Sequence, residues 1–198
     1  ALEDAKKDLI TTFNDTYNTV SNAYLDLPSA VTGMQNVLYG YTIGGQDSGQ
    51  WNIDVFRNSG NYNSNLTIRS FADIAERDYK TARTKYDQAL LDFKVLTRYS
   101  PTDDLEKLLS SSVDTTTAIA QALQSELNLL DAVVDDATVR NITVNSSITT
   151  LRTNARTYLT TVNSNLSALL NQQKSLDSTK KTIRDNERNI EIYKMISL

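Results

Sequence analysis

The chain has 198 residues and a formal net charge of −4, and it contains neither cysteine nor histidine. These absences exclude cysteine nucleophiles, imidazole bases and the usual zinc ligands, and no other nucleophile–base pair or phosphate-binding loop is visible. No run of basic residues is present, so nucleic acid is not an expected partner. We therefore predict that the protein is not an enzyme, with no catalytic residue, no cofactor and no metal.

The first segment predicts a helix from residue 2 to about residue 26, because its apolar residues recur at spacings of three and four. Pro28 is expected to break or kink this helix and to begin a second piece that ends near residue 39. The uncharged stretch 27–46 is about long enough to span a bilayer, but it contains proline, glycines and amides. Direct membrane insertion by this chain is therefore not expected.

Residues 40–65 differ from the rest, because five of the six glycines lie there. This irregular loop is the one region where the sequence allows a short strand or hairpin. Its aromatic residues are a candidate surface for a protein partner, since aromatic side chains dominate interface hot spots. They can equally form a small core that folds the loop onto the bundle, and a loop of this length favours that interpretation. The candidate contact residues are Tyr41, Trp51, Phe56 and Tyr62.

A helix is predicted from about residue 66 to residue 99, with a heptad of apolar residues from Ala75 onward. A tight turn at 99–101 follows, in which Ser100 is expected to cap the next helix and Pro101 to occupy its first position. That helix is predicted over 102–134, and Asp135 and Asp136 are assigned to the loop that follows it. The pair Asp103 and Asp104 is explained by its position at the positive end of the helix dipole. The pair Asp135 and Asp136 lacks the glycine and the regular spacing of a calcium loop.

The last helix is predicted from about residue 144 toward residue 198, a length typical of a coiled coil or an elongated bundle. Its broad apolar stripe narrows after Leu170 to one residue per heptad, which favours a single partner helix. We expect that partner to be the first helix, giving a two-helix stalk of 1–26 with 170–198 and a broader bundle over 28–169. Polar residues at the alternate seam positions are further candidates for partner contact: Gln173, Lys180, Glu187 and Lys194.

The sequence thus predicts one all-α module, an elongated antiparallel helical bundle or coiled-coil hairpin with one glycine- and aromatic-rich loop. Both ends of the chain fall within helical pattern, so we expect it to be a piece of a larger protein. Tyr79, Tyr86 and Tyr158 lie on predicted helical faces, where they either line a ligand cleft between helices or pack in the interior.

Several segments resemble the α-helical hairpin of periplasmic adaptor proteins, also called membrane fusion proteins, of the haemolysin-secretion-D type. Residues 1–9 and 15–17 are similar to the outgoing helix, and residues 183–190 to the returning one. Residues 86–90, 99–100 and 117–120 resemble the enlarged helical insert of some bacterial members. The resemblance implies a non-catalytic module in the bacterial periplasm or cell envelope that acts as a spacer and docking element. Its implied partners are a transporter, other envelope components or a second copy of the chain.

Two other functions fit the same pattern. A ligand-sensing bundle of a chemoreceptor-like membrane receptor would also bring both helical ends together, and it predicts a dimer with a cleft lined by arginine and tyrosine. A surface coiled-coil structural protein is the third. Flanking apolar spans of about 20 residues would indicate the receptor, whereas flanking β-rich lipoyl halves would indicate the adaptor.

Overall fold

The computed structural model describes residues 1–44, 49–60 and 62–196, with the side chains of residues 62–64 left out. Within this part of the chain the fold is all-α and has no strand, so the strand or hairpin allowed between residues 40 and 65 is absent from the described residues. The helices are α1 (Leu2–Tyr39), α2 (Asn52–Arg57), α3 (Tyr62–Val95), α4 (Thr102–Val139) and α5 (Ser146–Ile196).

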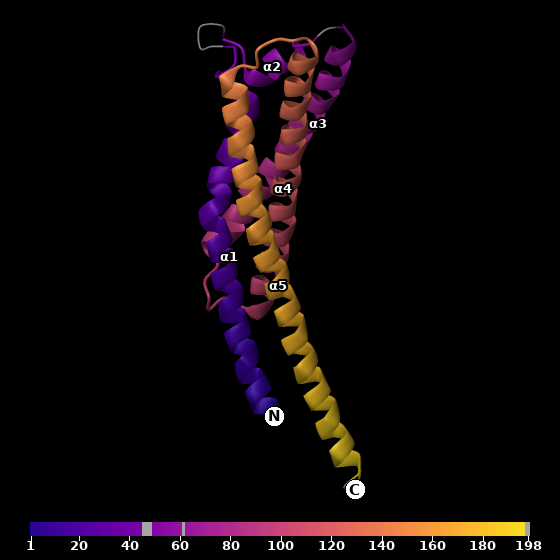
Figure 1. Cartoon of the computed structure of the whole chain (residues 1–198). Helices are drawn as coiled ribbons and strands as arrows, with labels where there is room; N and C mark the ends of the chain where they lie inside the picture. Colours follow the sequence, from indigo (N-terminus) through magenta and orange to yellow (C-terminus); the bar gives the residue numbers. More distant parts are fainter. Residues whose placement is uncertain (45–48, 61, 197–198) are drawn as a thin grey trace.

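The four long helices run alternately up and down as an elongated antiparallel bundle (Figure 1). We call the end that carries α2 the distal end; the N-terminus of α1 and the C-terminus of α5 lie toward the opposite end. The turn between α3 and α4 stops short of that opposite end, so α1 and α5 continue past it as a pair, which we call the stalk (Figure 1). At 1.5 Å per residue, the 51 residues of α5 span about 77 Å.

Strict heptads explain why these helices pack side by side. The buried residues of each long helix recur every seven positions, which keeps one face toward the bundle axis and gives a left-handed supercoil. On α1 the two buried rows are Phe13, Val20, Leu27 and Met34, and Thr16, Ala23, Ala30 and Val37. One buried row on α4 is Leu105, Ser112, Ile119, Glu126 and Val133, and the row on α5 is Ile148, Ala155, Val162, Leu169 and Leu176.

The bundle consists of two closely packed pairs, α1 with α5 and α3 with α4, and α4 joins the pairs by contacting both α5 and α1. The backbones of α1 and α3 touch only slightly, and aromatic rings fill the space between them. Tyr24 stacks on Phe93 with ring centroids 4.7 Å apart, and Tyr17 stacks on the same ring at 6.0 Å. Tyr79 and Tyr86 are buried in this aromatic layer, which favours interior packing for both. Burial also raises the pKa of the Tyr24 hydroxyl to about 12.

Polar side chains hold α1 and α5 in register where the pair leaves the bundle and the stalk begins. Gln172 of α5 donates from Nε2 to the Thr12 carbonyl at 2.9 Å and to the Thr16 hydroxyl at 3.0 Å. Thr12 and Thr179 share a hydroxyl contact of 3.3 Å. The polar contacts between α1 and α5 therefore run through Gln172 and Thr179 rather than through the predicted Gln173 series.

The predicted break at Pro28 is wrong, because α1 is continuous through this residue. Pro28 is exposed and lacks an N–H, so it removes one backbone hydrogen bond on the solvent side. Leu27 and Ala30 on either side are buried against the rest of the bundle. Tertiary packing of an amphipathic face supplies most of the stability of a helix, and here it outweighs the local cost of the proline.

The ends of α3 and α4 also differ from the prediction. Helix α3 ends at Val95, and the connection to α4 spans residues 96–101. Ser100 does not cap α4; its hydroxyl accepts from the Thr97 N–H at 2.9 Å and stabilises the turn itself. Asp136, predicted to lie in a loop, is buried inside α4, where it accepts from Arg140 Nε at 2.8 Å. This ion pair joins residues one helical turn apart and stabilises α4 past residue 134, where the polar sequence had indicated its end.

Candidate functional site

The distal end is closed by a buried asparagine. The Asn52 side chain is fully buried, and its Nδ2 donates to the Asn36 carbonyl at 3.0 Å and to the Thr42 hydroxyl at 3.1 Å. Its Oδ1 accepts from the Ile43 N–H at 3.0 Å, and its own N–H donates to the Gly40 carbonyl at 2.8 Å. Asn52 therefore links the start of α2 to the end of α1 and to the residues that directly follow α1.

Region 40–65 is less irregular than predicted, because it contains α2 and the first residues of α3. Helix α2 forms because Ile53 and Phe56, three positions apart, are both 1% exposed and insert into the core. Phe56 therefore belongs to the core and is not available as a surface contact. The side chain of Tyr62 lies outside the described residues.

Tyr41 and Trp51 are the two predicted contact residues of this region that the structure places at the surface. They are 41% and 45% exposed, and Trp51 Nε1 donates to the Tyr41 hydroxyl at 2.8 Å. The Trp51 ring also stands edge-on to Tyr39, with centroids 5.3 Å apart. The pair is thus held in place while half of each side chain faces solvent. Ordered, half-exposed aromatic side chains are typical of the anchors of protein interfaces.

An ionic cluster fixes α2 against α1 and α3. Arg57 of α2 contacts Asp73 and Glu76 of α3, each at 2.7 Å. Glu76 also pairs with Lys80 at 2.8 Å and accepts from the Tyr39 hydroxyl at 2.8 Å. Hydrogen bonds from Lys80, Arg57 and Tyr39 lower the pKa of the Glu76 carboxyl from 4.5 to about 2, against the opposing effect of its burial.

We expect this cluster to make the distal end acid-sensitive. Because the pKa of Glu76 is lower in the folded chain, its contribution to stability is present above pH 4.5 and is lost as the pH falls toward 2. A Glu76→Gln variant should be less stable than the parent at pH 6, and the difference should shrink at pH 3. Urea unfolding at the two pH values measures this, and a difference that grows on acidification would contradict the assignment.

The polar seam candidates do not form one site. Gln173 and Lys180 are half-buried, and Lys180 pairs with Glu106 of α4. Glu187 and Lys194 are exposed on the last turns of α5. Lys180 thus forms an ion pair within the chain. Glu187 and Lys194 lie on the stalk surface, far along α5 from Tyr41 and Trp51.

Tyr158 was predicted either to line a cleft or to pack in the interior, and it lines a groove. The groove lies between α1 and α5 at the distal end and has a volume of about 450 Å³. Sequence reasoning missed the α1 side of this groove, as it missed Asn52. The signal for the groove was present as Gly33 and Gly40, two small residues seven apart that leave room beside α5.

No described group of acidic side chains is arranged to hold a metal ion. No helix among the described residues is long and apolar enough to cross a membrane. No family model, no curated protein and no solved structure matches this chain.

Proposed function

We propose that this chain is a non-catalytic helical module of an envelope transport adaptor, which acts as a spacer and presents its distal end to a protein partner. One observation carries the proposal: α1 and α5 are continuous helices that run from the stalk to the distal end and pack against each other, so a load on the stalk is transmitted to the distal end (Figure 1). The α3–α4 pair stiffens this rod by packing against both helices through α4 and the aromatic layer.

The docking half of the proposal rests on Tyr41 and Trp51. They lie at the end farthest from the stalk, and Asn52 and the ionic cluster hold the backbone beneath them. An aromatic pair ordered before binding loses little conformational entropy when a partner covers it. We infer that the partner is a transporter or another envelope component.

Site-specific photocrosslinking in cells that express the full gene tests this function. A benzoylphenylalanine placed at Tyr41 or at Trp51 should yield one discrete adduct, identified by mass spectrometry as a subunit of a transport system. The matched control is the same label at Leu25, which is 77% exposed on the middle of α1 and should not give that adduct. Distal labels that give no adduct, or the same adducts as Leu25, would refute docking at this end.

Spacing is tested by shortening the stalk without changing its register. The contact between Thr12 and Thr179 places residues 2–8 opposite residues 183–189. Removing both heptads shortens the rod by about 10 Å and keeps the helical phase. The distal adduct should then be lost, whereas replacing both heptads with others of equal length should preserve it.

A ligand-sensing domain is the second candidate, and the groove at Tyr158 is the observation that favours it. A ligand there would touch α1 and α5 together, and these are the helices that form the stalk. This function predicts that a ligand changes the axial position of one stalk helix relative to the other. Spin labels on the two stalk helices would detect that displacement as a change in their separation on adding ligand.

A further inference from the structure

The groove between α1 and α5 has the dimensions of a small-molecule site. Its volume of about 450 Å³ lies within the range of roughly 300–1,000 Å³ that is usual for ligand pockets. Helix α1 contributes one wall and the first turns of α5 the other. The side chains and backbone that form it include Gly33, Asn36, Val37, Leu151, Asn154 and Tyr158.

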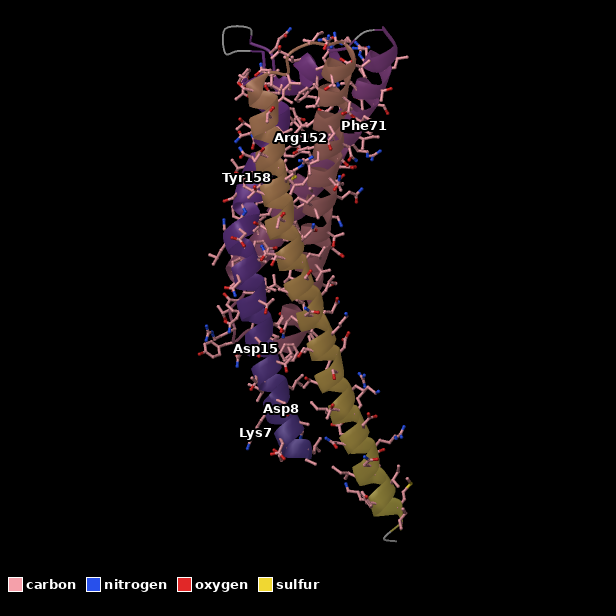
Figure 2. All side chains as sticks on the ribbon, in the orientation of Figure 1. Lys7, Asp8, Asp15, Phe71, Arg152 and Tyr158 are labelled. Carbon is pink, nitrogen blue, oxygen red and sulfur yellow. The ribbon has the colours of Figure 1, made fainter. Side chains whose placement is uncertain are left out.

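The position of the Tyr158 ring depends on Gly33. A Cβ added at Gly33 would lie 2.3 Å from Tyr158 Cε2, a distance that no side chain tolerates. The missing side chain therefore lets the ring lie against the α1 backbone, between the two helices (Figure 2). The ring is half-buried, so part of it remains available within the groove.

The polar groups of the groove are uncharged and come from both helices. No Asp, Glu, Lys or Arg lines it. The carboxamides of Asn36 on α1 and Asn154 on α5 are exposed, and neither forms a hydrogen bond to another described side chain or backbone group. Each carboxamide offers two donors and an acceptor, and Ser147 and Tyr158 add hydroxyl groups.

We propose that this groove binds a neutral oligosaccharide. Sugar rings present adjacent hydroxyls, which carboxamides can bond as donors and acceptors at once, and apolar C–H faces, which suit the half-buried ring of Tyr158. A charged ligand would lose hydration there without gaining an opposite charge. A docked helix is disfavoured because its apolar face would cover the exposed carboxamides of Asn36 and Asn154 without giving them hydrogen-bond partners. The inference is independent of the spacer and docking role and can fail without affecting it.

NMR titration of the ¹⁵N-labelled chain tests the proposal with three defined probes. The neutral probes are maltotriose and tri-N-acetylchitotriose, and the charged comparator is trigalacturonate. At least one neutral probe should shift the amides of Asn36, Gly40 and Asn154 at millimolar concentrations, and trigalacturonate should not. The assignment would be overturned if neither neutral probe shifted these amides at about 20 mM, or if trigalacturonate bound more strongly than both.

Variants separate the groove from a non-specific effect. Asn154→Ala and Tyr158→Ala should each weaken binding about tenfold, the loss expected when one good contact worth about 1.4 kcal/mol is removed. Asn154 is exposed, so its variant keeps the test valid if Tyr158→Ala fails to fold. Thr157→Ala, an exposed neighbour outside the groove, should bind like the parent chain. Equal binding by Asn154→Ala and Thr157→Ala would place the sugar elsewhere and refute the site.

Discussion

Replacing Glu126 with leucine is expected to raise the free energy of unfolding by about 2 kcal/mol at pH 7. Glu126 is fully buried in a heptad row of α4, and neither carboxyl oxygen has a hydrogen-bond partner among the described residues. A buried polar group without a partner costs free energy, and an apolar side chain of similar size removes that cost. Urea unfolding of the two chains at pH 7 measures the gain.

The pH dependence of this gain identifies the carboxyl as its cause. Burial raises the pKa of Glu126 well above 4.5, so above pH 4.5 the folded chain retains a proton that the unfolded chain releases. The free energy of unfolding of the parent therefore falls as the pH rises through this window. The advantage of Glu126→Leu should be smallest near pH 4.5 and should grow toward pH 8.

Gln121→Leu provides the matched control for this prediction. Gln121 lies on the exposed side of α4, so the same new side chain should change stability by no more than about 0.5 kcal/mol. A Glu126→Leu chain less stable than the parent, or one whose advantage shrinks as the pH rises, would mean that the carboxylate has a stabilising partner.

Asn52→Ala is expected to destabilise the chain by about 2–3 kcal/mol, because it removes a fully buried side chain that bonds two backbone groups and one hydroxyl. The loss should be concentrated at the distal end, where hydrogen exchange of the Ile43 amide should accelerate most. Thermal unfolding and hydrogen exchange together measure the effect.

Asn58→Ala is the matched control, which tests whether the loss of stability in Asn52→Ala depends on the burial of Asn52. Asn58 is exposed at the end of α2, six residues beyond Asn52, and its replacement should alter stability by no more than about 0.5 kcal/mol. Equal losses in the two variants would show that α2 tolerates no asparagine replacement at all, and the role assigned to the Asn52 side chain would be wrong.

The helical fold could be predicted from sequence because heptad spacing is a property of the chain alone. The rows through Ala75 and Tyr79 on α3 set the packing face without any reference to a partner. The same reasoning failed at Pro28 and Asp136, where local signals for a break are outweighed by packing on neighbouring helices and by an ion pair. Local sequence does not contain those contacts.

The buried position of Glu126 could have been predicted from the sequence, because Glu126 is spaced seven residues from both Ile119 and Val133. A search for apolar residues at heptad spacing overlooks it because its side chain is charged. The role of Asn52 could not have been found in this way, since its partners are two backbone groups and a hydroxyl, up to 16 residues away, that come together only in the folded chain. The groove can be predicted only in part. The helical spacing indicates Tyr158 as a candidate lining residue, but its contact with Gly33 joins residues 125 positions apart along the chain.

The rigidity of the rod is the central claim, and one distance along α5 tests it most directly. The chain has no cysteine, so spin labels can be attached at cysteines introduced for exposed Thr153 and Arg188. These positions lie five heptads apart on one face, and a continuous helix places them about 52 Å apart. Double electron–electron resonance should give a single narrow distribution near that distance. A broad distribution, or one centred below about 45 Å, would show that α5 bends or unwinds beyond the bundle and would contradict the account of the chain as a spacer.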